Sequence, residues 1–163
     1  MAKKPGRPFN NEWAGKTGLK LNLGCGDHIE EGYINIDIAA DCDLKLDLEK
    51  AKLPFDNESV DEIYAGQIME HINNFIPLMN ECHRVLKSGS GLHGTGKLII
   101  EVPCYPAPEC FSDPTHVRVF TQKSFDYFDK RNDLWRRHEY GIKPWSMILK
   151  KLTNWNLTAE LLK

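Results

Sequence analysis

The 163-residue sequence lacks any long apolar run and has no marked excess of either charge. No stretch approaches the roughly 20 apolar residues that a membrane-spanning helix needs, and residues 1–6 lack the apolar segment of a signal peptide. The formal net charge of −2 creates no field that would attract nucleic acid or an anionic membrane. These absences favour a cytoplasmic protein with no nucleic-acid and no membrane partner.

The cysteines lack the spacing of a disulfide framework or of a zinc site. There are five of them, an odd number, and no two form a C-x-x-C pair. His28, His83, His93 and His138 are scattered and show no ligand spacing that would favour zinc. We therefore expect reduced thiols and no metal. The cysteines are Cys25, Cys42, Cys82, Cys104 and Cys110.

The length is that of one domain with a real hydrophobic core. Residues 1–18 are polar and rich in Gly, Pro and Lys, which predicts a flexible N-terminal arm, and residues 19–163 form a single predicted domain. Residues 3–8 have a weak likeness to a minor-groove DNA hook, but one short copy favours a solvated tail.

Short apolar runs with β-branched residues alternate with longer polar stretches, which predicts strands with helices between them. The clearest helix begins near Asn73 or Asn74, either of which could cap it. An Asn-rich junction at 153–156 predicts a terminal hairpin, and the Gly-rich residues 88–96 a flexible surface loop. The predicted strands are 20–24, 33–37, 60–64 and 97–102.

The most informative segment is 20–37, where an apolar strand runs into two glycines and a second strand ends in an acid. Gly24 and Gly26 allow a tight turn and a close approach of the backbone to a ligand. Asp37 stands where a carboxylate can accept hydrogen bonds from both ribose hydroxyls, although capping a turn is the simpler role. Because Ile29 replaces the third glycine of a dinucleotide fingerprint, a nucleoside without phosphates fits better than NAD.

These residues resemble the class I S-adenosylmethionine-dependent methyltransferases, in particular small bacterial and phage members. The resemblance covers roughly residues 19–128 and implies an α/β, three-layer Rossmann-like methyltransferase fold with a mostly parallel sheet and an antiparallel C-terminal strand. Its segments are Leu21–Gly26, Asn35–Ile38, Asp47–Leu48, Leu53–Asp56, Val60–Tyr64, Met69–Ile72, Glu81–Gly89, Asp113–His116 and Phe120–Thr121.

The resemblance implies S-adenosyl-L-methionine as cofactor, S-adenosyl-L-homocysteine as product, and a set of cofactor-binding residues. Asp37 would hold the ribose, Asp47 would accept from the adenine amino group while Leu48 covers the ring, and Gln67 would face the methionine end. Asn22 departs from the acid usual in the first motif. Asp47 could equally belong to a solvated acidic face. The full set is Asn22, Gly24, Cys25, Gly26, Asp37, Ile38, Asp47, Leu48 and Gln67.

Three residues on the acceptor side are candidate catalytic residues: His116, Asp113 and His71. The methyl group of a sulfonium is already activated, so the protein must align an acceptor, exclude water and accept a proton if the nucleophile carries one. A histidine with a pKa near neutrality suits that last task. His71 could instead cap the following helix, and the Asp-Pro-Thr-His sequence is also a good turn.

The sequence therefore predicts an S-adenosylmethionine-dependent methyltransferase that acts on a small molecule, as a monomer or homodimer. One alternative is a sugar or sugar-nucleotide methyltransferase of surface-glycan synthesis, which the basic residues 130–138 would favour. Another is a non-catalytic cofactor-binding module that serves a partner subunit.

Overall fold

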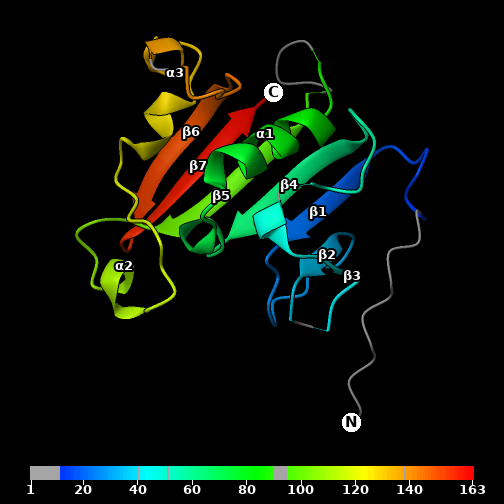
Figure 1. Cartoon of the computed structure of the whole chain (residues 1–163), viewed down its shortest axis with the longest axis horizontal. Helices are drawn as coiled ribbons and strands as arrows, with labels where there is room; N and C mark the ends of the chain where they lie inside the picture. The colour runs from blue at the N-terminus through cyan, green and yellow to red at the C-terminus, as the bar shows by residue number, and fades with distance from the viewer. Residues whose placement is uncertain (1–11, 40, 51, 90–94, 138) are drawn as a thin grey trace.

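The computed structural model describes residues 12–39, 41–50, 52–89, 95–137 and 139–163. They form one seven-stranded sheet in the order β3-β2-β1-β4-β5-β7-β6 (Figure 1). The strands are β1 (Leu19–Leu23), β2 (Ile34–Asp37), β3 (Leu44–Lys45), β4 (Val60–Gly66), β5 (Lys97–Pro103), β6 (Ser146–Thr153) and β7 (Asn156–Leu162). The helices are η1 (Leu48–Lys50), η2 (Met69–His71), α1 (Phe75–Val85), α2 (Glu109–Ser112), η3 (Ser124–Tyr127) and α3 (Leu134–Arg137).

The sheet is mostly parallel, with an antiparallel hairpin at its C-terminal edge. Strands β1 to β5 pair in parallel, whereas β7 pairs antiparallel with both β5 and β6. Asn154 and Trp155 connect β6 to β7 with positive φ angles of 47° and 66°, the geometry of the tight turn that matches strand twist. The predicted Rossmann-like fold and its antiparallel C-terminal strand are confirmed.

One face of the sheet carries the hydrophobic core. Its apolar side chains alternate along β1, β4 and β5 with polar ones, and α1 crosses this face in the view of Figure 1. Phe75 at the start of α1 contacts Phe120, Phe125 and Phe128 edge to face. The segment around η3 therefore packs on the same side of the sheet as α1.

The opposite face is polar. Neighbouring strands place Lys20 and Lys97 on either side of Glu62, with ion-pair distances of 3.6 and 3.1 Å. The sequence predicted three layers, with helices on both faces of the sheet. On this face the structure differs from that prediction, because residues 24–33 between β1 and β2 form turns and loop and no helix. Within the described residues, the helix that would begin a layer on this side is therefore missing.

The N-terminal part of the described chain is packed against the domain. Trp13 is buried against Phe55, with ring centroids 5.5 Å apart, and the Gly15 amide donates to Asp56 over 2.8 Å. Residues 12–18 thus differ from the expected arm, because an aromatic side chain anchors them. Residues 1–11 of that arm, and residues 90–94 of the predicted Gly-rich loop, lie outside the described residues.

Candidate functional site

The glycine loop after β1 is held at the carboxyl end of β2. The amides of Gly24 and Cys25 both donate to the carbonyl of Ile36, over 2.8 and 3.1 Å. Gly24 has a φ of 64°, and a Cβ there would lie 2.4 Å from the Ile68 side chain, so only glycine fits. Gly26 also has a positive φ, 50°, but nothing lies within 4 Å of its Cβ position. The space beside Gly26 is where a cofactor can approach the backbone.

Asp37 joins the glycine loop to the turn that follows β2. Its Oδ2 accepts from the Gly26 amide at 3.0 Å and its Oδ1 from the Ala39 amide at 2.8 Å. The carboxylate is half-buried and stands at the carboxyl edge of the parallel strands, where open α/β sheets bind ligands. A carboxylate offers about four acceptor positions, so this arrangement is compatible with the predicted hydrogen bonds to ribose.

Asn22 and Cys25 are buried beneath the loop. The Asn22 amide nitrogen donates to the His28 carbonyl and to Asn35 Oδ1, both at 2.9 Å, so its two hydrogens brace the loop from below. Burial raises the pKa of the Cys25 thiol to about 12, which keeps it protonated. Both residues support the loop that would contact the cofactor.

The other predicted cofactor residues are divided between surface and core. Ile38 is 58% exposed beside Asp37, and Asp47 lies at the same edge, since the Leu46 amide donates to the Asp37 carbonyl. Leu48 is buried among the core residues. Gln67 is exposed at the end of β4, where its side chain donates to Asn156 at the start of β7. Gly24, Gly26, Asp37 and Ile38 thus lie together, whereas Leu48 points into the core.

The segment after β5 is fixed to η2, so the two predicted acceptor-side segments meet. The Val117 amide donates to the Glu70 carbonyl over 2.9 Å. Arg118 donates to the carbonyls of Ile72 and Asn73, and its guanidinium lies 4.7 Å from the centre of the Phe75 ring. These contacts hold the Asp-Pro-Thr-His turn against the residues that follow β4.

His71, Thr115 and Asp113 form a chain of hydrogen bonds. Thr115 Oγ1 donates to Asp113 Oδ1 over 2.6 Å and lies 2.9 Å from His71 Nδ1. The bond from the Thr115 hydroxyl, followed by a bond from the Thr115 backbone amide to the same oxygen, lowers the pKa of Asp113. His116 Nδ1 lies 3.4 Å from the Cys110 carbonyl, and the rings of His71 and His116 are 4.7 Å apart. All three candidate catalytic residues are therefore brought into one cluster.

Glu70 completes this cluster and was missed by the sequence analysis. Its side chain is 1% exposed, and its Oε2 has no hydrogen-bond partner among the described residues. Burial raises the pKa of Glu70, against the attraction of His71 and His116. One ligand atom of each of these three residues lies within 4.8 Å of the other two. The position of Glu70 beside His71 in the sequence indicates that it could belong to the site, but only its burial in the structure shows that its side chain faces inward.

Two exposed aromatic rings lie in the segment between β5 and His116. Tyr105 and Phe111 are 57% and 63% exposed and contact each other edge to face at 6.4 Å. Cys110, whose carbonyl faces His116, is the neighbour of Phe111. An apolar surface therefore adjoins the cluster, whereas Phe120 and Phe128 belong to the core.

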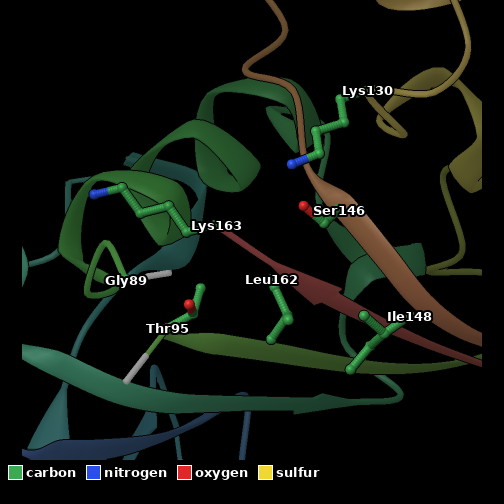
Figure 2. A pocket seen from close by; sticks show the side chains of 7 residues that line it. All are labelled: Gly89, Thr95, Lys130, Ser146, Ile148, Leu162 and Lys163. Atoms are coloured by element: carbon green, nitrogen blue, oxygen red, sulfur yellow. The ribbon is translucent and has the colours of Figure 1, made fainter. Parts of the chain in front are cut away.

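The basic segment lies elsewhere. Lys130 lines a cavity of about 270 Å³ together with Ser146, Leu162 and Lys163 (Figure 2). This cavity lies where β5 begins and β7 ends, at the edge of the sheet opposite to Asp37 and Glu70. It contains none of the predicted site residues, and the segment after Lys130 continues into α3 at the same end of the molecule (Figure 1).

Comparison with known proteins agrees with the fold. Residues 21–93 match the family model described as a methyltransferase domain. No curated protein sequence matches the chain significantly. None of the helices in the described residues has the length and apolar character needed to cross a membrane.

Several solved structures share the fold. A methyltransferase dependent on S-adenosylmethionine (SAM) from Archaeoglobus fulgidus superimposes with a TM-score of 0.61 at 13% identity, covering 93% of this chain and 88% of its own. A protein from Thermotoga maritima, described as a possible histamine N-methyltransferase, gives 0.60 at 15% identity, with 92% and 84% covered. A methyltransferase solved with the Haloferax volcanii Trm112 activator gives 0.59 at 13%, with 93% and 85% covered.

The fold is thus shared with these methyltransferases, and the matched segment 21–93 includes the glycine loop. The match of residues 21–93 and the shared fold make this chain similar to S-adenosylmethionine-dependent methyltransferases, whose cofactor is S-adenosyl-L-methionine.

Proposed function

We propose that this enzyme transfers the methyl group of S-adenosylmethionine to a small-molecule acceptor bound beside Glu70, His71 and His116. The observation that carries the proposal is the closeness of two regions at one edge of the sheet. The side chain of Ile68 packs against Gly24 of the glycine loop, and Ile68 precedes Glu70 by only two residues. A cofactor on the glycine loop would therefore present its methyl end near the cluster.

In this proposal the cofactor half of the site belongs to the glycine loop and the end of β2. Asp37 accepts from the ribose hydroxyls, and the open space at Gly26 admits the nucleoside. Ile38, exposed next to Asp37, provides an apolar surface for the adenine. Asn22 and Cys25 act indirectly, by supporting the loop from below.

The acceptor half belongs to the histidine cluster. The Thr115 hydroxyl has one hydrogen and gives it to Asp113, so His71 Nδ1 must be the donor to Thr115. A carbonyl only accepts, so His116 Nδ1 donates to Cys110. Both rings then carry their lone pair on Nε2. Either nitrogen could take the proton of an amine or hydroxyl acceptor, as the sequence predicted for His116.

The exposed aromatic pair favours a flat or cationic acceptor. The faces of Tyr105 and Phe111 could contact such a molecule at the mouth of the cluster. The alternative of a sugar or sugar-nucleotide acceptor rested on the basic residues 130–138, and Lys130 lies at the other end of the sheet. A small amine or aromatic alcohol is therefore the acceptor class that we favour.

We infer a monomer or homodimer that needs no other chain for cofactor binding. The relative from Haloferax volcanii was solved with an activator protein, so an activating partner is the second candidate for this enzyme. Light scattering of the purified chain, together with its turnover in isolation, separates these cases. A chain that binds the cofactor but turns over no acceptor would favour the partner.

The test of the function has two parts. By calorimetry, S-adenosylhomocysteine should bind more tightly than NAD or ATP, because the loop lacks the third glycine and any lysine for phosphates. Methyl-labelled cofactor should then label an acceptor from pools of amines and aromatic alcohols. Tighter binding of NAD would contradict the proposal.

The same assay tests the acceptor side. His116→Asn should lower turnover by about 10² to 10⁴, the range typical of general acid–base catalysis, with cofactor affinity unchanged. His71→Asn shows whether the second ring shares the role, and Glu109→Gln on the exposed surface of α2 is the control. If the His116 variant lost cofactor binding instead, the loop after β5 would belong to the nucleoside site.

A further inference from the structure

We propose that Glu70, His71 and His116 bind one divalent transition-metal ion, of which Zn²⁺ is the type, on the acceptor side of the site. The first argument is the set of ligands. Two imidazoles and one carboxylate are the donors that zinc and its neighbours prefer, whereas Mg²⁺ and Ca²⁺ prefer oxygen. Three protein ligands also leave a coordination position for a substrate, as in catalytic zinc sites.

The second argument is the spacing of the ligand atoms. One atom from each residue lies within 4.8 Å of the other two. Around a zinc ion, ligands at about 2.0–2.2 Å from the metal lie about 3–4 Å from one another. Small rotations of side chains that the described structure already brings together would close this difference. The three residues come from two segments, η2 and the loop after β5, which are joined by the bond from the Val117 amide to the Glu70 carbonyl.

The third argument is the unpaired carboxylate oxygen. Glu70 is 1% exposed, and among the described residues its Oε2 has no hydrogen-bond partner. A buried polar atom without a partner destabilises the folded protein, and a charged group does so more strongly. A cation between Glu70 and the two imidazoles would remove that destabilisation.

The fourth argument is the surroundings of the two histidines. Metal-binding histidines usually donate their other N–H to a carboxylate, a carbonyl or a similar acceptor, which fixes the tautomer. His71 donates to the Thr115 hydroxyl, which in turn donates to Asp113, and His116 donates to the Cys110 carbonyl. In both rings this leaves Nε2 as the nitrogen that can coordinate.

Only the catalytic use of the metal rests on the proposed function; the binding of the metal does not. A metal ion would bind the acceptor through a lone pair of its oxygen or nitrogen and make its proton more acidic, so that the proton leaves to water before the methyl group is transferred. A histidine that binds metal through Nε2 cannot accept a proton there. The metal role and the base role of His116 therefore exclude each other.

The test measures metal binding without cofactor or acceptor. The full chain, stripped with a chelator, is titrated with Zn²⁺ against a chromophoric competitor, and separately with Co²⁺ while its visible spectrum is recorded. We expect one equivalent to bind. Glu70→Gln, His71→Asn and His116→Asn should each weaken binding at least tenfold, and Thr115→Ala by about tenfold, the lower end for a residue that orients a ligand.

Two control variants and one fold check accompany the titration. Glu109→Gln and His28→Asn change exposed residues of the same types and should leave metal affinity unchanged. Binding of S-adenosylhomocysteine to each variant shows that it is folded. Because this check is independent of the metal, a chain that binds cofactor and no metal overturns the inference and leaves the proposed function standing.

Two further results would also overturn the inference. One is that the Glu70 and His116 variants bind zinc as tightly as the parent and that the Co²⁺ spectrum shows a thiolate-to-cobalt band. That result would assign the metal to cysteines. The other is no metal binding and a protonated histidine beside Glu70 by NMR, which would make the cluster an ion pair. A loss of activity after chelation that Zn²⁺ restores would support a catalytic use of the metal.

Discussion

At the scale of single residues, Asp37 connects the parts of the cofactor site. One carboxylate oxygen holds the Gly26 amide and the other the Ala39 amide, so the acid shapes the loop that it is proposed to serve. The simpler role of a turn-capping aspartate and the proposed role in binding ribose are therefore compatible. A substitution that keeps the shape can separate them.

Asp37→Ala should weaken binding of S-adenosylhomocysteine by about 1.5–3 kcal/mol, the usual value for hydrogen bonds to a charged group. Asp37→Asn keeps one acceptor oxygen and should lose less. Calorimetry measures both, with Asp41→Ala, an exposed acid after β2, as the control. Unchanged affinity of the alanine variant would assign the ribose to another residue.

At the scale of elements, α1 begins with a cap that comes from a distant residue. The sequence predicted that Asn73 or Asn74 caps the helix, but Asn74 makes no capping bond with its side chain. Glu49, at η1, accepts instead from the amides of Asn73 and Asn74, at 2.6 and 3.2 Å. The bond from the Asn73 amide is the first cause that lowers the pKa of Glu49. A carboxylate is favoured at a helix N-terminus, where the amides and the helix dipole are positive.

Glu49→Gln should therefore destabilise the protein by about 1 kcal/mol, a typical cost of losing a helix cap. For a domain of this size that corresponds to a melting temperature lower by about 2–4 °C. Because folding lowers the pKa of Glu49, its carboxylate stabilises the protein fully above the unfolded pKa and no longer does so in acid. The difference in stability between parent and Glu49→Gln should therefore be largest at neutral pH and disappear in acid. Thermal melts of parent, variant and Glu31→Gln, an exposed control, measure it. An equal melting temperature at neutral pH would contradict the capping role.

At the scale of the whole molecule, a histidine joins α1 to the C-terminal hairpin. His83 contacts the fully buried Trp145 edge to face at 5.0 Å. Burial, followed by the charge of Lys163, lowers the pKa of His83 to about 4, whereas the Pro144 carbonyl acts in the opposite direction. The neutral ring is thus the form that fits between helix and sheet.

Since the unfolded pKa is 6.5, the unfolded state binds more protons than the folded state between pH 6.5 and about 4. Stability from this group is complete above pH 6.5 and is lost as the pH falls toward 4. His83→Gln removes the titration. The difference in unfolding free energy between parent and variant, measured in urea from pH 7 to pH 4.5, should therefore shrink in acid. A difference that stays constant would mean that His83 does not titrate in this range.

Local sequence patterns were enough to predict β1, β2, β4, β5, α1, the terminal hairpin and the glycine loop, but not the two-residue strand β3. Each of these elements depends on residues that are neighbours in the sequence. Alternating apolar side chains mark the strands, an apolar stripe of helical period marks α1, the Asn-rich turn marks the hairpin, and glycines that adopt positive φ mark the loop. The resemblance of these segments in order was also enough to predict the fold and the similarity of residues 21–93 to a methyltransferase domain.

What only the tertiary structure decided depends on contacts between residues far apart in the chain. It placed Glu49 rather than an asparagine at the start of α1, and Trp13 in the core. It left the segment between β1 and β2 without a helix, because a network of Asn22 and Asn35 closes it as a loop. Above all, it turned Glu70 inward between His71 and His116. Burial of a carboxylate is a property of the whole packed molecule, and no local pattern encodes it.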